Sequence, residues 1–138
     1  MNFLAHIYLS GDNEMIAIGN FIADGVRGKQ YKKFQKDIKT GILLHRQIDT
    51  FTDAHPIVRQ STKRLHKNYS HYSGVIVDIL YDHFLAKNWK SYSDIPLDIY
   101  VNKFVSFKNF ANLFDVEVIF KSPKRIKFLL VLLTIVLR

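Results

Sequence analysis

The residues of this chain that could do chemistry are histidines and carboxylates at helical spacing. His45 and Asp49 are four residues apart, so on a helix they lie one turn apart on the same face. An imidazole and a carboxylate at this spacing can approach one divalent ion, and a ligand set without sulfur suits Mn, Fe, Zn or Mg. The same pair also occurs on ordinary helix surfaces, so the interpretation needs support from elsewhere in the chain.

A second segment supplies that support. Asp78 and Asp82 are one helical turn apart, and His83 follows the second of them. Carboxylates on the inner face of an apolar helix are costly unless they are paired or bound to metal. We therefore expect these acids either to share a metal with the first pair or to pair with an arginine such as Arg46. Their helix is expected to be largely buried because its apolar residues form a stripe: Val75, Ile79, Leu80, Phe84 and Leu85.

Further candidates are polar residues in apolar surroundings. Asp24 ends an apolar run and could bind metal or cap the next turn, while His6 could bind metal or be a satisfied core histidine. We rank Asp24 above His6. Arg27 and Arg46 are near these acids in sequence; each guanidinium could bind a phosphate through two parallel hydrogen bonds or form a salt bridge.

The elements that position these residues are predicted to be helices. Apolar residues recur with a period near 3.6, strand alternation is weak in the first hundred residues, and no Asn-Gly hairpin turn occurs there. The sequence therefore predicts an all-α fold, a compact helical bundle. The expected helices cover residues 14–24, with Gly19 at a close contact, residues 30–48, a segment beginning near Pro56, and residues 73–90.

Composition limits the class of protein. The chain has 138 residues and is 48% apolar, which fits one main core. It contains no cysteine, which agrees with the reducing cytoplasm. Its start has no basic region typical of a signal peptide, so export is not expected. The net charge of +8 favours an anionic partner. The basic run at residues 63–67 has no interleaved aromatic residues, so a solvated face is favoured over a nucleic-acid contact.

Four blocks in order resemble the acyl carrier protein phosphodiesterase family, and together they cover roughly residues 1–104. The first is Met1-Asn2-Phe3-Leu4-Ala5-His6, and the second is Gly19-Asn20-Phe21-Ile22-Ala23-Asp24 with Arg27-Gly28. The third runs from Gly41-Ile42 through His45-Arg46 and Ile48-Asp49 to His55-Pro56. The fourth runs from Gly74 through Asp78 and Tyr81-Asp82-His83-Phe84 to Asn88-Trp89.

This resemblance implies a helical fold related to the His-Asp (HD) metal phosphohydrolases and dependence on Mn²⁺ or another divalent metal such as Mg²⁺ or Fe²⁺. The implied reaction, in fatty acid biosynthesis, hydrolyses the phosphodiester that links 4′-phosphopantetheine to a serine of holo acyl carrier protein. The strongly acidic carrier protein is the implied partner, and neither nucleic acid nor membrane is expected. Asp78 and His6 are weaker candidates than the residues that match the family pattern. Those residues are Asp24, His45, Asp49, Asp82 and His83 for the metal, with Asp24, Asp82, His83 and the phosphate-binding Arg46 as catalytic residues.

The last part of the chain departs from the family. After about Lys103 the resemblance ends, and residues 128–137 are almost wholly apolar yet too short to span a bilayer, which needs about 20 residues. We expect a catalytic domain over residues 1–104 and a divergent segment over residues 105–138, either truncated or frameshifted or a genuine short variant. The alternatives to an active phosphodiesterase are an inactive carrier-protein-binding module and a His-Asp hydrolase of nucleotides.

Overall fold

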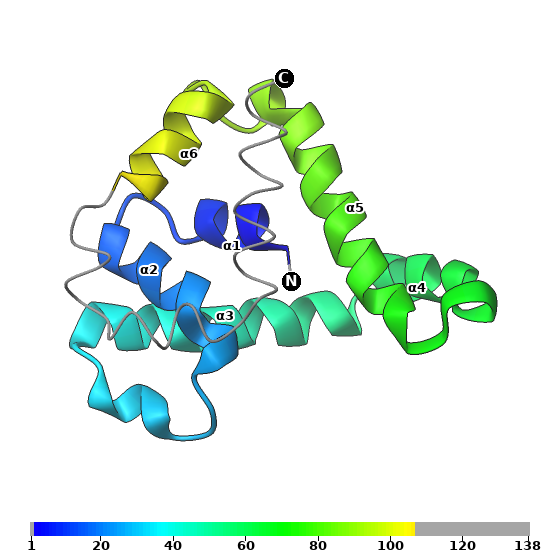
Figure 1. Ribbon diagram of the computed structural model, residues 1–138, viewed down its shortest axis with the longest axis horizontal. Helices are drawn as coiled ribbons and strands as arrows, with labels where there is room; N and C mark the ends of the chain where they lie inside the picture. The colour runs from blue at the N-terminus through cyan, green and yellow to red at the C-terminus, as the bar shows by residue number, and fades with distance from the viewer. Residues whose placement is uncertain (1, 107–138) are drawn as a thin grey trace. The chain divides into compact units, whose positions relative to one another are not determined.

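The computed structural model of the chain describes residues 2–106. All regular structure in this range is helical, which confirms the all-α prediction (Figure 1). The chain divides into two compact units, one ending at Lys87 and the other beginning at Asn88. The predicted boundary at residue 104 stays a prediction, because residues 107–138 lie outside the described range.

The first unit carries every predicted site residue on a short series of helices. α1 packs against α2 and α5, α2 packs against α3, and α4 packs against both α3 and α5. The buried apolar core of this unit comes mainly from four of these helices, and Ala23 and Val26, which follow α2, add to it. The helical core residues are Phe3, Leu4 and Ile7 of α1; Ala17, Ile18, Phe21 and Ile22 of α2; Ile38 and Ile42 of α3; and Val77 of α5. The elements are α1 (Phe3–Leu9), α2 (Glu14–Ile22), η1 (Ala23–Gly25), η2 (Gln30–Lys33), α3 (Lys36–Ala54), α4 (Pro56–Tyr69), η3 (Ser70–Tyr72) and α5 (Ser73–Lys87).

The helix bounds differ from the predictions for local reasons. The predicted helix over residues 30–48 is a short 3₁₀ turn, a break at extended Phe34 and Gln35, and then α3, which continues to Ala54. α3 ends there because the residue before a proline disfavours helical geometry, and His55 is indeed extended. Pro56 then opens α4 at its first position, as predicted, and the His55 side chain accepts a hydrogen bond from the Ile57 amide at 3.3 Å.

Two glycines let α2 and α3 approach at backbone distance. A methyl group on Gly19 would overlap the Ile38 carbonyl, and one on Gly41 would overlap the Ile16 carbonyl and lie 2.7 Å from the Asn20 nitrogen. The close contact predicted at Gly19 is therefore confirmed, and Gly41 is its counterpart on the facing helix. This pair sets the separation between the two helices that carry Asn20 and His45.

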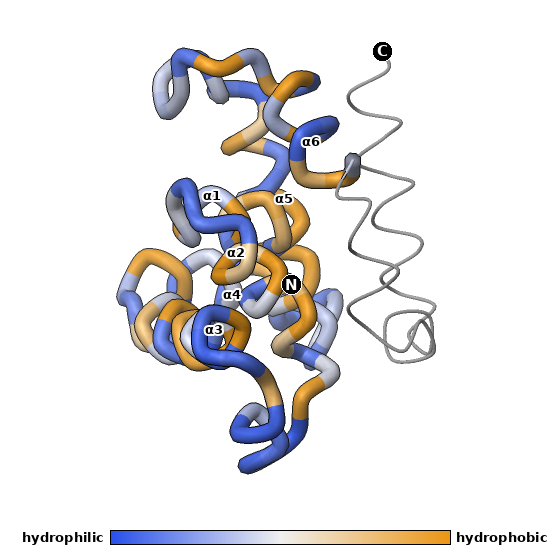
Figure 2. Tube along the Cα trace, turned by 90° about the vertical axis from the view of Figure 1, so that its left-hand side faces the viewer, coloured by the Kyte–Doolittle hydropathy of each residue, from blue (hydrophilic) through white to orange (hydrophobic). Residues whose placement is uncertain are grey.

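The expected burial of the α5 stripe is wrong. Ile79 and Phe84 are 52% and 51% exposed, and Val75 and Leu80 are also exposed, while Val77 and Asp82 are buried. α5 is apolar around most of its circumference, as its mainly orange trace indicates (Figure 2). Periodicity therefore could not indicate which face the rest of the first unit covers.

The second unit is described from Asn88 to Ser106. The predicted helix over residues 73–90 ends at Lys87, and a 3₁₀ turn (η4, Trp89–Ser91) precedes α6 (Leu97–Val105). Trp89 is buried, its indole N–H donates to the Ile95 carbonyl at 2.7 Å, and its ring packs against Tyr100. Among the helices described in either unit, none combines the length and the apolar character needed to cross a membrane.

Candidate metal centre

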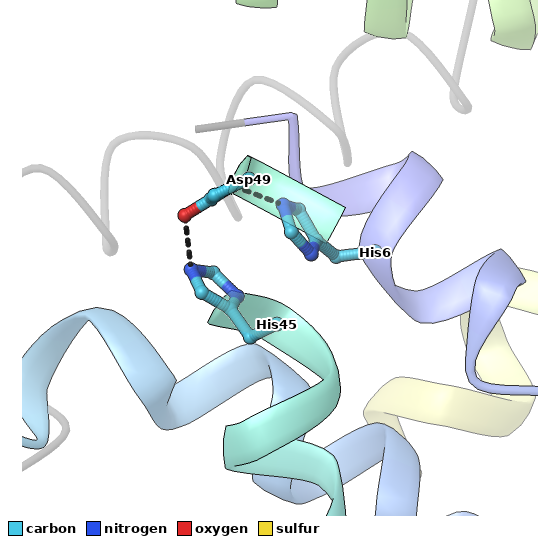
Figure 3. Close-up of side chains that lie close together, drawn as sticks. All are labelled: His6, His45 and Asp49. Atoms are coloured by element: carbon cyan, nitrogen blue, oxygen red, sulfur yellow. Dashed lines mark hydrogen bonds and ion pairs between the residues drawn. The ribbon is translucent and has the colours of Figure 1, made fainter. Parts of the chain in front are cut away.

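Three of the candidate residues converge in the first unit. His6 of α1 and His45 of α3 stack, with ring centroids 4.1 Å apart and planes 20° apart. Asp49, one turn after His45, bridges them: Oδ1 lies 3.1 Å from His6 Nε2, and Oδ2 lies 3.1 Å from His45 Nε2 (Figure 3). One ligand atom from each residue lies within 4.8 Å of the other two, which is a spacing that one ion could satisfy. We call these three residues the His–Asp cluster.

A buried amide orients both rings. Asn20 of α2 has no exposed surface, and its Oδ1 accepts from Nδ1 of His6 at 2.8 Å and from Nδ1 of His45 at 3.0 Å. Its Nδ2 donates to the His6 carbonyl and to Ser10 Oγ, both at 2.9 Å. Because a backbone carbonyl can only accept, the amide cannot be flipped. Asn20 therefore fixes both imidazoles with Nδ1 protonated.

This tautomer leaves Nε2 of each ring as the atom that can bind a metal ion. In a neutral ring Nε2 then carries a lone pair, and here it faces carboxylate oxygens at hydrogen-bond distance. Two electron-rich atoms at that distance need a positive charge between them, either a proton or a metal ion. A hydrogen bond to the ring nitrogen that does not bind the metal commonly orients metal-ligating histidines. The arrangement thus fits a divalent cation that is bound by two Nε2 atoms and a carboxylate.

The electrostatics of the cluster point the same way. Burial alone would lower the pKa of His45, but hydrogen bonds and charges from Asp24 and Asp49 outweigh it and raise that pKa to about 9. Burial would raise the pKa of Asp49, yet the hydrogen bonds from His45 and His6 hold it well below its usual range. The cluster therefore attracts positive charge strongly, and in the absence of metal a proton on His45 supplies it.

Asp24 lies beside this cluster. It follows α2 in the η1 turn, and its Oδ1 lies 3.2 Å from His45 Nε2. The side chains of Asp24 and Asp49 are 33% and 46% exposed, whereas both imidazoles are buried. The carboxylate side of the cluster is thus open to solvent, so an ion or a substrate could approach from there.

Asp82 is buried in α5 but interacts with backbone. Its Oδ2 accepts from the Leu4 amide at 2.9 Å and its Oδ1 from the Ala5 amide at 3.1 Å. These amides are in the first turn of α1, so Asp82 caps the helix that carries His6 and pairs with no arginine among the described residues. Burial raises the pKa of Asp82 to about 6, although both backbone hydrogen bonds lower it.

The other predicted residues lie outside the cluster. His83 is on an exposed face of α5, since successive helical residues point in different directions, and its ring contacts Phe84. Asp78 is half-buried one turn before Asp82. Nη2 of Arg46 donates to the carbonyls of Val26 and Gly28, both at 2.9 Å, and the guanidinium lies over the Tyr31 ring. Arg46 thus holds the loop that follows Asp24. The predictions of metal or catalytic roles for these residues stay predictions.

The sequence interpretation assigned no role to Asn20 and ranked His6 low. The signal for Asn20 was present, because it is the single amide within the apolar run Ile16–Ile22 of α2. A fully buried polar group of this kind requires hydrogen-bond partners. The role of His6 could be recognised only from the fold, because α1 brings it against His45, 39 positions later in the chain.

Fold and site together define an all-helical protein with a buried histidine pair and solvent-facing carboxylates suited to a divalent ion. A family model described as acyl carrier protein phosphodiesterase matches residues 1–114, and the chain belongs to this family. No solved structure matches the chain, so the predicted relation to the HD phosphohydrolases stays a prediction.

Similar proteins carry the same description. The chain is 38% identical over 89 residues to the acyl carrier protein phosphodiesterase of Yersinia pestis, covering 64% of this chain and 46% of that protein. The Photorhabdus laumondii protein is 39% identical over 89 residues, covering 64% and 45%. The Escherichia coli (O139:H28) protein is 38% identical over 102 residues, covering 73% and 53%. The chain thus spans about half the length of the curated relatives it matches.

Proposed function

We propose that this chain is a metal-dependent phosphodiesterase that hydrolyses the bond between 4′-phosphopantetheine and a serine of holo acyl carrier protein, giving the apo protein. Membership of the family supports the reaction, and the His–Asp cluster supports the metal. The single observation that carries the proposal is that both Nε2 atoms, held in one tautomer by Asn20, face carboxylate oxygens at 3.1–3.2 Å. We further propose that the protein acts in fatty acid biosynthesis in the cytoplasm.

In this proposal His6, His45 and Asp49 hold the ion, and Asp24 is a fourth ligand or a base. Manganese is the preferred ion because the family resemblance implies it, with Mg²⁺ or Fe²⁺ as alternatives, and a ligand set of nitrogen and oxygen without sulfur is compatible with all three. A bound divalent ion would polarise the phosphoryl oxygens of the substrate. The Asp24 side chain is partly exposed, so its carboxylate could accept a proton from an attacking water.

Two residues have supporting roles in this proposal. Asp82 positions His6 by fixing the first turn of α1, while a direct metal or catalytic role for Asp82 and His83 is the alternative. Arg46 would contact the phosphate through Nη1 or Nε, because its Nη2 already bonds the Val26 and Gly28 carbonyls. A guanidinium carries five N–H donors, so both tasks are compatible.

The test is to incubate the purified chain with holo acyl carrier protein and manganese and to measure the mass of the carrier protein. Loss of the phosphopantetheine arm, abolished by chelator and by Asp49→Ala or Asp24→Ala, supports the proposal. The matched control is Asp37→Ala, since Asp37 is in the first turn of α3, about 18 Å along the helix from Asp49. An unchanged mass with folded, metal-loaded protein would refute turnover by this chain.

A further inference from the structure

A basic hollow lies beside α4, and none of its described lining residues belongs to the His–Asp cluster. It encloses about 680 Å³ and is lined mainly by one face of α4, with Asp53 from the end of α3 and Gly74 from the start of α5. The α4 residues that line it are Val58, Arg59, Thr62, Lys63, His66 and Lys67. All of these elements belong to the first unit.

The charge of α4 is entirely positive. Its fourteen residues include Arg59, Lys63, Arg64 and Lys67 and no Asp or Glu. Arg59, Lys63 and Lys67 follow each other at four-residue spacing, so they form one stripe along the helix, and all three are exposed. The stripe extends over about 12 Å, which is roughly two turns of a helix laid alongside it. Arg64 is exposed on α4 but does not line the hollow.

The hollow begins close to the His–Asp cluster. Asp53 follows Asp49 by four residues on α3, so the two carboxylates lie on the same face about one turn apart. Arg59 is tied to that end, since its Nε donates to the Asp53 carbonyl at 3.2 Å. Among the described residues that line the hollow, Asp53 alone is acidic, so an acidic partner is favoured toward Lys63 and Lys67.

We propose that the stripe of Arg59, Lys63 and Lys67 is the docking surface for an acidic helix of the protein substrate, which would bring the phosphodiester toward Asp49. This inference rests on the proposed function and adds the place where the substrate binds. Exposed cations on one face steer an acidic partner and fix its register, and each exposed ion pair contributes modestly. The stripe is therefore a specificity surface separate from the chemistry.

The test compares two neighbouring residues with the same charge change. Binding of fluorescently labelled holo acyl carrier protein to the full chain is measured by anisotropy at low salt. Lys63→Glu and Lys67→Glu are each expected to weaken binding about five- to tenfold, Lys63→Gln by less, and the matched control Arg64→Glu by about twofold at most. Equal losses for Lys63→Glu and Arg64→Glu, or no loss for Lys63→Glu, would overturn the docking surface.

Further measurements separate this inference from the proposed function. With manganese present, Lys63→Glu should raise KM and leave kcat near the wild-type value, because the stripe acts on binding. If the wild type binds the carrier protein selectively through the stripe but does not hydrolyse it, the function fails and the docking surface stands. If hydrolysis occurs with the same KM in Lys63→Glu, the docking surface fails and the function stands. If Lys63→Glu weakens binding to a single-stranded oligonucleotide but not to the carrier protein, the docking surface is also overturned.

Discussion

Manganese binding to the His–Asp cluster should release a proton, so its affinity should rise with pH. In the absence of metal, burial alone would lower the pKa of His45. Hydrogen bonds and charges from Asp24 and Asp49 outweigh this effect and raise the pKa to about 9. At pH 7 the His45 Nε2 therefore carries a proton, which the ion must displace. Two pH units separate 7 from about 9, so the apparent affinity at pH 7 should be roughly a hundredfold below its limit.

The same proton stabilises the metal-free fold. Because the folded pKa of His45 lies above its ordinary value of 6.5, this contribution is fully present below pH 6.5 and is lost as the pH rises through about 9. Metal-free protein should thus become less stable over the range in which metal binding becomes tighter. The two trends have one cause and should be measured on the same sample.

The assay is titration calorimetry with Mn²⁺ at pH 6.5, 7.5 and 8.5, in two buffers of different ionisation enthalpy at each pH. We expect the Kd to tighten by about tenfold per pH unit and about one proton to be released per ion. His45→Asn should weaken Mn²⁺ binding and remove the dependence of the Kd on pH. His71→Asn, at an exposed position in η3, should leave the Kd and its pH dependence as in the wild type. A Kd that is constant across this range, with no proton release, would refute the tautomer and charge assignment.

Three substitutions test the framework of the site by urea unfolding. Gly41→Ala should lower the free energy of unfolding by about 2–4 kcal/mol, because its methyl group overlaps the Ile16 carbonyl, whereas Gly74→Ala meets no atom within 4 Å and should change it by less than about 1 kcal/mol. Asn20→Ala should lower the free energy of unfolding by about 3 kcal/mol, because it removes the partner of Nδ1 of His6 and His45 and of the His6 carbonyl. The same substitution should weaken Mn²⁺ binding. Asp82→Asn should flatten the pH dependence of the unfolding free energy in chelator. Burial raises the pKa of Asp82 to about 6, so wild type should lose about 2 kcal/mol relative to the variant between pH 4 and 7.

Each of these expectations has a contrary result. Equal effects of Gly41→Ala and Gly74→Ala would contradict the backbone contact between α2 and α3. Unchanged Mn²⁺ affinity in a folded Asn20→Ala protein would show that the amide does not orient the rings. Parallel pH curves for wild type and Asp82→Asn would show that Asp82 is not a buried carboxylate.

Local spacing was enough to predict part of the site. His45 and Asp49 were found because four-residue spacing on one helix fixes their relation without any tertiary information. The close approach of the helix carrying Gly19 was also predictable, because a glycine within an apolar helical run usually has a packing reason. The all-α class followed from the same apolar periods.

The remainder depended on tertiary contacts. His6 and Asn20 reach the cluster only because α1 and α2 pack against each other and α2 against α3, and no local pattern encodes those pairings. The burial of α5 was mispredicted because a helix that is apolar on most sides does not indicate which side is covered. Asp82 was correctly placed on an inward face, but its backbone partner Leu4 is 78 residues away in the sequence, so no local pattern could indicate it.

The hydrogen bond between Asp82 and the start of α1 has a consequence for synthesis on the ribosome. Leu4 and Asp82 are 78 residues apart, so α1 emerges long before the carboxylate that caps it. A nascent chain that already contains His6, His45 and Asp49 would therefore still lack the carboxylate that caps the first turn of α1. If the cluster binds manganese as proposed, we expect its affinity to reach the full value only after α5 has emerged.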